Sequence, residues 1–353
     1  MKEVTIYDIA SKLNLSTATV SRALCNKNTI SEKTKRKVLH AAGEMGYRVN
    51  HFARNLRNAN NNQLIGIIFH KLNSQFSINV LYGIEKIARN AGYDIIICHS
   101  SESHEQEISN AANLFKRRVN GLIIGLSTDM DNIDHLNSYI ENKIPVILFD
   151  RVKPDFKGIK VVIDNFKAAY QVTRHLIDQG CKNIVHIAGN EKSSVFVDRL
   201  NGYKSALAES NIQYKPEWII YKDNDETSGA SISQKIMAMR PRPDGIFAVN
   251  DISAVMCMKE LQKAGISIPG DIAFAGFNND LISTVIEPNL TTIDYSGIQM
   301  GEIAAMALLD AITNNAVTPP NYTIKMNADL VIRHHPSGGN NFSSLIMPGS
   351  IFY

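Results

Sequence analysis

The side chains best suited to specific chemistry lie near the start of the chain, at Arg22 and, about one helical turn earlier, at Thr17 and Ala18. A guanidinium group can donate two hydrogen bonds to the acceptors of a guanine in the major groove of DNA. The short side chains of Thr17 and Ala18 allow contact with thymine methyl groups or a close approach of the backbone. The alternative for Arg22 is a phosphate contact, which carries no sequence information. These residues predict recognition of base pairs, provided that one exposed helix face presents them.

Two short helices joined by a tight turn would position these residues. Apolar side chains recur at helical spacing from Ile6 to Leu13, and Asn14 then favours the left-handed conformation that ends a helix. Ser16 is placed to cap a second helix by accepting a hydrogen bond from the amide of Thr19. This pattern predicts a helix-turn-helix module. The alternative is an ordinary helical hairpin inside a larger core.

A third helix and a linker complete the N-terminal region. Ser31 is the candidate cap of this helix, whose apolar face runs from Val38 to Met45 before Gly46 ends it. Residues 1–49 therefore predict a small three-helix unit. Residues 50–63 carry only a thin apolar stripe and end in an Asn-rich stretch, which is typical of a linker. A simple tether is the alternative to a segment with its own function.

The motif Ser-Thr-Ala-Thr-Val-Ser-Arg (16–22), preceded by Tyr-Asp-Ile-Ala (7–10), resembles the headpiece of the LacI/GalR family of bacterial transcriptional regulators. The likeness runs to about residue 336 and therefore covers nearly the whole chain. It continues through Ser-Glu-Lys-Thr-Lys-Arg-Lys-Val (31–38), Gly-Tyr-Arg-Val-Asn (46–50) and Ala-Arg-Asn-Leu (53–56).

The motifs and the resemblance together assign a set of residues to DNA binding. Arg22 is the candidate for base recognition, whereas Tyr7 and Tyr47 are candidates for phosphate contacts that set the register on the duplex. The expected DNA-binding residues are Thr5, Tyr7, Ser16, Thr17, Ala18, Ser21, Arg22, Ser31, Tyr47, Asn50, Ala53 and Leu56.

Leu56 is an apolar side chain between Arg54 and Arg57, in a segment with little core to join. Apolar side chains of this kind can open a base step from the minor groove and kink the duplex. The resemblance implies this role for Leu56, on a short hinge helix that forms when two chains pair on DNA. The family's usual Pro before Asn50 is Val49 here, which changes the entry to the hinge.

Charge is distributed unevenly along the 353 residues. Residues 1–62 carry a net charge of +7, whereas the rest of the chain carries −4. A basic head on a mildly acidic body is expected of a phosphate-binding module joined to a domain that does not contact DNA. The length suggests two or three folded units.

The chain reads as a cytoplasmic, nucleoid-associated protein. No apolar run approaches the roughly 18 residues of a membrane span, and residues 1–5 show no signal-peptide core. The four cysteines lie far apart with no CxxC pair, which predicts reduced thiols, most of them buried.

From residue 64 onward, short apolar runs alternate with helical segments, which predicts doubly wound α/β sheets. The expected strands are 64–69, 94–98, 121–126, 145–150, 183–189, 218–221, 245–250 and 272–276, and the expected helices include 79–91, 104–118, 167–179, 198–210 and 252–265. Eight strands suit two lobes better than one wide sheet. With the resemblance, the expected fold is an all-α helix-turn-helix headpiece plus a periplasmic-binding-protein-like (type I) two-lobed effector and dimerisation domain over residues 64–336. Residues 337–353 form a Gly/Ser/Asn-rich tail without heptads.

Ligands of such sheets bind beyond the carboxyl ends of the strands, so we expect an effector between the two lobes. Planar Arg and Asn groups that offer paired hydrogen bonds suit a sugar, a sugar phosphate or a related metabolite. A helix cap or a surface ion pair is the alternative for each residue alone. Family members usually carry Asp where this chain has Asn278, so anions should be repelled less here. From strand ends and the resemblance, the candidate ligand-binding residues are His70, Phe76, Asp150, Arg199, Asn250 and Asn278.

No pattern indicates catalysis, a cofactor or a metal. The chain has no Gly-x-Ser-x-Gly motif and no P-loop, and its ten histidines show no metal-ligand spacing. The sequence therefore predicts a ligand-responsive transcriptional regulator that acts as a repressor and binds a pseudo-palindromic operator as a homodimer. The rivals are a solute-binding protein or sugar-handling enzyme with the same body fold, and a constitutive architectural DNA-binding protein.

Overall fold

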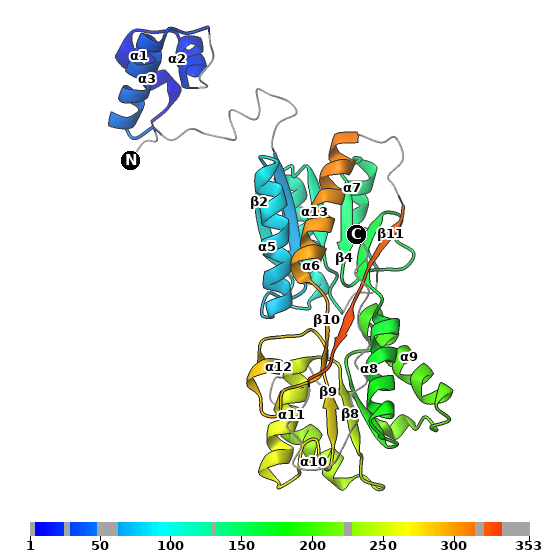
Figure 1. The fold of residues 1–353 in the computed structure, drawn as a ribbon. Coiled ribbons are helices and arrows are strands. Elements are labelled where there is room, and N and C mark those ends of the chain that lie inside the picture. Colours follow the sequence, from blue (N-terminus) through cyan, green and yellow to red (C-terminus); the bar gives the residue numbers. More distant parts are fainter. Residues whose placement is uncertain are drawn as a thin grey trace, which may run out of the picture. The chain divides into compact units, whose positions relative to one another are not determined.

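The computed structural model describes residues 4–24, 29–47, 63–128, 132–221, 228–314 and 321–333 (Figure 1). The chain divides into two compact units, residues 1–62 and residues 63–353. Each unit is described by itself.

Unit 1 is a bundle of three helices, α1 (Ile6–Leu13), α2 (Thr17–Leu24) and α3 (Glu32–Glu44). Asn14 takes the left-handed conformation at the end of α1, with a φ angle of 51°. The Ser16 hydroxyl accepts a hydrogen bond from the Thr19 amide at 3.1 Å, as the sequence predicts. Ser31 caps α3 in the same way. The buried core consists of Ile9, Ala10, Val20, Ala23, Val38, Ala41 and Ala42.

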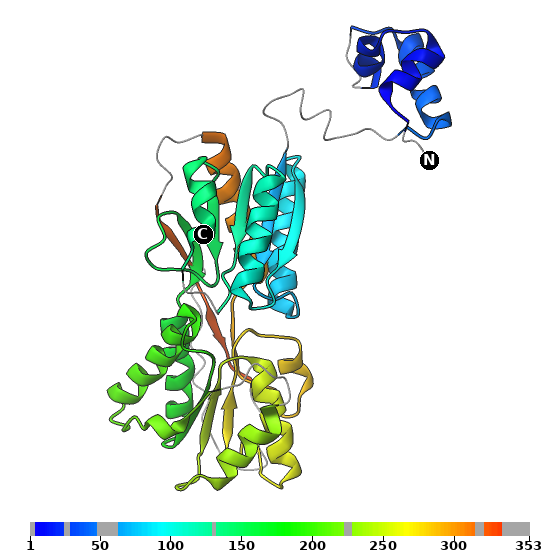
Figure 2. The same cartoon turned by 180° about the vertical axis from the view of Figure 1, so that it is seen from behind.

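Unit 2 consists of two α/β lobes, each built on a sheet of parallel strands (Figures 1 and 2). The sheet of lobe 1 has the strand order β11-β5-β4-β3-β1-β2, and that of lobe 2 has the order β7-β6-β8-β9. The strands of lobe 1 are β1 (Leu64–Phe69), β2 (Asp94–His99), β3 (Gly121–Ile124), β4 (Val146–Phe149), β5 (Ile159–Ile163) and β11 (Thr323–Met326). Those of lobe 2 are β6 (Ile184–Ala188), β7 (Ile219–Tyr221), β8 (Gly245–Ala248) and β9 (Ala273–Ala275).

Helices cover both sheets, because two parallel strands start at the same end of the sheet and the chain must cross back over the sheet, usually as a helix, to begin the next strand. Lobe 1 carries α5 (Gln75–Asn90), α6 (His104–Lys116), the 3-10 turn η1 (Asp134–Leu136), α7 (Asn137–Glu141) and α13 (Gly297–Asn314). Lobe 2 carries α8 (Asn165–Asp178), α9 (Ser194–Glu209), η2 (Pro216–Trp218), α10 (Ser228–Ala238), α11 (Asp251–Lys263) and α12 (Ile282–Val285).

The chain passes between the lobes after β5, after β10 (Thr292–Asp294) and between β11 and β12 (Asp329–Val331). Strands β10 and β12 pair antiparallel and form a small sheet of their own. All eight expected strands are present, but β5, β10, β11 and β12 were not expected from the sequence. In β5 a lysine interrupts the apolar run: Lys160 is buried and donates to the carbonyl of Phe156 at 2.7 Å.

Several helices begin earlier than their apolar pattern predicts. Helix α5 starts at Gln75 rather than 79, because Ser74 accepts a hydrogen bond from the Ser77 amide and caps a polar first turn. Helix α9 starts at Ser194 rather than 198. The earlier start of α5 brings Phe76 into a helical turn, and that of α9 moves Arg199 from the expected first turn of its helix into the second.

Glycines let α5 and α13 pack closely in lobe 1. A Cβ atom at Gly83 would lie 2.1 Å from the carbonyl oxygen of Ile298 on α13. On the other helix, a Cβ atom at Gly301 would lie 2.1 Å from the carbonyl oxygen of Val80 on α5. Neither contact is sterically possible, so both positions require glycine for this packing.

Two of the three described cysteines are buried, Cys181 and Cys257, and Cys98 is half-buried. Burial raises the pKa of the Cys181 thiol to about 11 and that of Cys257 to about 12, which keeps both thiols protonated and unreactive. Among the described residues, no helix has the length and apolar character to cross a membrane.

Candidate functional site

A cavity of about 210 Å³ lies between the two lobes of unit 2. Its lining includes all six residues that the sequence analysis selects as ligand-binding candidates. His70, Phe76 and Asp150 come from lobe 1, and Arg199, Asn250 and Asn278 come from lobe 2. The fold thus brings together residues that are up to 208 positions apart, at the carboxyl ends of the strands.

On the lobe 1 side, His70 and Asp150 directly follow β1 and β4. Burial, together with the charge of Arg151, lowers the pKa of His70 to about 3, so its ring is neutral at pH 7. Burial raises the pKa of the Asp150 carboxyl, and the charges of Arg151 and Arg199 oppose this effect. Asp150 also has a φ angle of 57°, in the left-handed region that few residues other than glycine, asparagine and aspartate adopt.

Aromatic rings form a second part of the wall. Phe76 lies in the first turn of α5, and its ring centroid is 5.0 Å from that of Tyr295. The Tyr295 hydroxyl donates a hydrogen bond to Oδ1 of Asn278 at 3.1 Å. Tyr295 directly follows β10, where the chain passes from lobe 2 to lobe 1, so this ring lies at a connection between the lobes.

Contacts with three residues of lobe 2 hold the Arg199 side chain at the cavity. Its Nε donates to Oδ1 of Asn165 at 2.9 Å, and its Nη1 donates to the carbonyl of Val249 at 2.6 Å. Its Cζ lies 3.5 Å from the centre of the Phe277 ring. Burial lowers the pKa of the guanidinium, which still stays charged because an arginine does not lose its proton in proteins. Arg199 therefore supports lobe 2 as well as facing the cavity.

The two asparagines also combine structural bonds with a position on the cavity. Asn250 caps α11, because its Oδ1 accepts a hydrogen bond from the Ser253 amide at 2.8 Å. Its Nδ2 makes no hydrogen bond within the described part of the chain, which leaves that donor to a ligand. Asn278 has a φ angle of 111° and, besides accepting from Tyr295, donates to Asp280.

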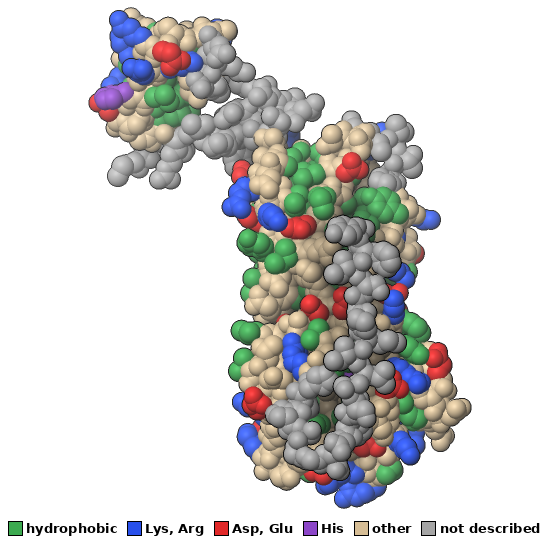
Figure 3. Space-filling view, in the orientation of Figure 1, with side chains coloured by type: hydrophobic (Ala, Val, Ile, Leu, Met, Phe, Trp, Pro, Cys, Tyr) green, Lys and Arg blue, Asp and Glu red, His purple; other side chains and the backbone are tan. Residues whose placement is uncertain are grey.

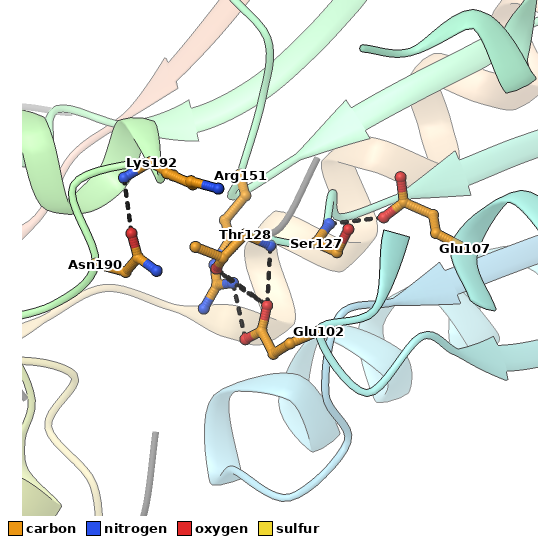
Figure 4. A network of polar contacts seen from close by, with 7 residues as sticks. All are labelled: Glu102, Glu107, Ser127, Thr128, Arg151, Asn190 and Lys192. Carbon is orange, nitrogen blue, oxygen red and sulfur yellow. Dashed lines mark hydrogen bonds and ion pairs between the residues drawn. The ribbon is translucent and has the colours of Figure 1, made fainter. Parts of the chain in front are cut away.

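A polar network on the lobe 1 side was not predicted from the sequence (Figure 4). Arg151 donates to the carboxylate of Glu102 at 2.7 Å, and the Thr128 amide donates to the same carboxylate at 3.0 Å. Burial is the largest single influence on the pKa of Glu102 and raises it, but the charge of Arg151, the nearby His70 and the hydrogen bonds from Thr128 and Arg151 together outweigh burial, so the pKa is lowered. The signal that could have indicated this network is the adjacent Asp150-Arg151 pair at a strand end; its partners are too distant in sequence to recognise.

In unit 1, the DNA-binding candidates differ in how freely they are presented. Arg22 and Ala18 are exposed, and Tyr7 is 66% exposed. Thr17 and Ser21 are half-buried on the same helix. The Thr5 hydroxyl donates to Asp8 at 2.6 Å. Ser16 and Ser31 act as caps, and Tyr47 packs against the core of unit 1. Asn50, Ala53 and Leu56 lie outside the described residues.

Comparison with known proteins identifies the family. Residues 62–334 match the family of periplasmic binding proteins and sugar binding domains of the LacI family, and residues 5–50 match the bacterial regulatory proteins of the lacI family. The chain is 30% identical over 330 residues to the HTH-type transcriptional repressor PurR of Photobacterium profundum, which covers 93% of this chain and 97% of that protein.

A second relative is the catabolite control protein A of Priestia megaterium, which is 30% identical over 312 residues, 88% of this chain and 93% of that protein. In fold, the chain is similar to the lac repressor dimer bound to operator and the anti-inducer ONPF, with a TM-score of 0.81 and 24% identity over 94% of this chain and 98% of that one. These relatives are transcriptional regulators and not enzymes. The chain belongs to the LacI family of ligand-responsive transcriptional regulators.

Proposed function

We propose that this regulator represses transcription by binding a pseudo-palindromic operator as a homodimer, and that a sugar or related metabolite bound between the lobes changes its operator affinity. The observation that carries the proposal is the cavity, where Asp150 of lobe 1 and Arg199 of lobe 2 line the same space. A ligand that contacts both lobes favours one angle between them over another, and it shifts the equilibrium by its difference in affinity for the two states.

On the DNA side, α2 would enter the major groove. It is the second helix of the helix-turn-helix, and Arg22 and Ala18 are exposed on it. Tyr7, Thr17 and Ser21 would add contacts around it. Thr5, Ser16, Ser31 and Tyr47 would contribute phosphate contacts, and Asn50, Ala53 and Leu56 would act in the hinge. The hinge residues rest on the resemblance, since they lie outside the described residues.

A homodimer would present two such heads to two half-sites. Exposed hydrophobic side chains along one edge of unit 2 support this assembly (Figure 3). Ile78 and Tyr82 lie on α5, Met256 lies on α11, and Leu281 and Val285 lie at α12, where they are 72% and 70% exposed. Exposed apolar surface of this kind is typical of an interface with another protein chain.

Charge indicates the class of effector. The cavity lining carries the basic groups of Lys71, Arg151 and Arg199, and the acidic groups of Glu102, Asp150 and Asp280. These charges balance, and His70 is neutral because its pKa is lowered to about 3. A balanced lining with paired donors and an aromatic ring suits a neutral polyhydroxy ligand better than an anion, so a neutral sugar is preferred over a sugar phosphate.

Calorimetry on the full chain tests the effector proposal, with neutral sugars, sugar phosphates and purine bases as separate panels. The ligand that binds is then added to an operator titration. We expect operator affinity to change by about 5- to 150-fold, the usual range of allosteric coupling. A bound ligand that leaves operator affinity unchanged would contradict the proposal, and binding of purines alone would replace the sugar as the effector.

Arg22→Ala tests the base-recognition role. We expect this variant to lose about 1–3 kcal/mol of discrimination for the preferred operator while it keeps its affinity for random DNA. The matched control is Lys33→Ala on the exposed surface of α3, which should change binding to both DNAs alike. Gel-shift titrations on operator and random duplexes at one salt concentration measure both effects. An equal loss on both duplexes for Arg22→Ala would assign Arg22 to the DNA backbone.

A further inference from the structure

Three side chains with metal-ligating atoms converge in lobe 1, apart from the cavity. His104 is the first residue of α6, Glu107 lies one turn later, and His135 lies in η1. The distance from Nε2 of His135 to Oε1 of Glu107 is 3.1 Å, and that from Nδ1 of His104 to the same oxygen is 3.9 Å. One ligating atom of each residue lies within 4.8 Å of the others.

This cluster is buried and its ligating atoms lack hydrogen bonds. The side chain of Glu107 is 0% exposed, that of His135 is 2% exposed and that of His104 is 16% exposed. Oε2 of Glu107 accepts a hydrogen bond from the Ser127 amide at 2.6 Å (Figure 4). In contrast, Oε1 of Glu107, Nδ1 of His104 and both ring nitrogens of His135 have no hydrogen-bond partner in the described part of the chain. Buried polar atoms without partners destabilise a fold unless something else binds them.

The spacing of the three atoms fits a tetrahedral metal site. Zinc binds His nitrogen and carboxylate oxygen at about 2.0–2.2 Å, which places neighbouring ligand atoms of a tetrahedron roughly 3.3–3.6 Å apart. The two measured distances, 3.1 and 3.9 Å, lie on either side of this range. We propose that His104, Glu107 and His135 bind a divalent transition-metal ion, with Zn²⁺ as the best fit to two imidazoles and a carboxylate. Three protein ligands leave the fourth position to water.

A bound ion would cross-link separate segments of lobe 1. It would tie η1, which leads into α7, to α6 and, through Glu107, to the backbone at Ser127. The next residue, Thr128, binds Glu102 in the wall of the effector cavity (Figure 4). The expected effect is therefore a more stable lobe 1, including this wall. The alternative is an ion pair between His135 and Glu107 without a metal.

No metal site was expected from the sequence, because the histidines show no ligand spacing along the chain. His104 and Glu107 do have the i,i+3 spacing that places two side chains on one helix face. The third residue, His135, comes from a separate turn 28 residues after Glu107, so only the fold shows that it belongs to the group.

The test uses the full chain after treatment with a chelator. Calorimetry with ZnCl₂ and thermal unfolding are compared for the wild type, Glu107→Gln and His135→Ala. The matched control is His40→Ala, which removes a histidine with a 76% exposed side chain from unit 1. Far-UV circular dichroism verifies that each variant is folded. Glu107→Gln is conservative, since its amide oxygen can still accept from the Ser127 amide.

We expect one tight equivalent of Zn²⁺ per chain and a rise in Tm in the wild type and in His40→Ala. Affinity should fall by at least about 100-fold in Glu107→Gln and His135→Ala, since even residues that only support a ligand are worth about 10- to 100-fold. Co²⁺ should give the intense visible absorption of a tetrahedral site in the wild type and lose it in both variants. If Zn²⁺ does not bind, or if the folded variants bind it as the wild type does, the metal site is wrong and the cluster is an ion pair.

Discussion

Two arginines face the effector cavity from opposite lobes, and the protein holds them in different ways. Arg151 of lobe 1 donates to the carboxylate of Glu102 at 2.7 Å, so its charge is compensated. Arg199 of lobe 2 is bound by neutral partners, the side-chain oxygen of Asn165 and the carbonyl of Val249, and by the ring of Phe277. Arg199 thus keeps a charge that a polar ligand can use, whereas Arg151 mainly links the chain segments at Glu102 and Thr128.

Beside the cavity, Arg151 and Val152 of lobe 1 contact residues of lobe 2. Arg151 lies 5.4 Å from the centre of the Phe196 ring of lobe 2, and the Ser194 hydroxyl donates to the carbonyl of Val152 at 3.2 Å. These are weak contacts between the lobes. Within the described residues, the hydrogen bonds of each arginine side chain stay inside its own lobe.

The largest effect is expected from Arg199→Ala. This substitution leaves two buried acceptors, on Asn165 and Val249, without donors. Each unsatisfied acceptor costs about 1–3 kcal/mol, so we expect the free energy of unfolding to fall by about 4 kcal/mol. We also expect the variant to lose effector binding. Urea unfolding and calorimetry measure the two losses. Arg151→Ala is the comparison, and its stability loss should be smaller because Glu102, at 15% side-chain exposure, retains some hydration. Equal losses in the two variants would remove the distinction between the arginines.

Acidification should give the next largest effect, through neutral histidines that lie near each arginine. Burial lowers the pKa of His186 in lobe 2 to about 4, with a smaller contribution from Arg199, and the pKa of His70 in lobe 1 is lowered to about 3. In the unfolded chain these groups titrate near pH 6.5. The stability that they contribute is complete above that pH and is lost as the pH falls toward 4, because the unfolded chain then binds the extra protons.

For His186 alone the loss between pH 7 and pH 4 amounts to about 3 kcal/mol. Urea unfolding at a series of pH values measures it. His186→Phe should flatten the curve, since phenylalanine fits a ring stacked against Phe247 at a centroid distance of 4.5 Å and does not titrate. An unchanged slope in this variant would assign the acid sensitivity to other groups, with His70 as the first candidate.

The smallest effect is expected from Glu102→Gln, which leaves the charge of Arg151 uncompensated. The cavity then gains one net positive charge, and binding of a sugar phosphate should improve by about fivefold, or about 1 kcal/mol, while a neutral sugar changes little. Thr128→Val is the matched control: it removes a hydroxyl that binds Glu102 at 3.0 Å but changes no charge. Calorimetry with a sugar and its phosphate distinguishes the two outcomes. A gain for both ligands, or in the control, would show that charge is not the cause.

The regular parts of the fold were predictable from the sequence. Strand β1 matches the expected run from residue 64 to residue 69, because a central parallel strand is buried on both faces and reads as continuous apolar sequence. The turn at Asn14 and the cap at Ser16 were predictable as well, since both depend on local chemistry. Strands β10 and β12 were not, because three-residue strands at the lobe connections carry no periodic pattern.

The site residues were also predictable where the signal is local in the sequence and not where it depends on tertiary contacts. The six cavity candidates could be selected because they stand at strand ends or match family motifs, and the fold brings all six to one cavity. Glu102 and Thr128 gave no such signal, since their pairing with Arg151 depends on how three separate connections meet beyond the sheet. The bonds that fix Arg199 also depend on tertiary contacts with Asn165 and Val249.

Helix α13, which packs closely on α5, connects the cavity with the opposite end of lobe 1. This helix has 18 residues and begins at Gly297, two positions after Tyr295 at the cavity. Toward its other end, Leu308 is pressed against Gly121 at the start of β3, beside the first residues of β1. A helix of 18 residues is about 27 Å long, so a rotation of about 2° at the cavity displaces the far end by about 1 Å. A small tilt at the cavity would therefore be enlarged at the end of lobe 1 where the chain enters unit 2.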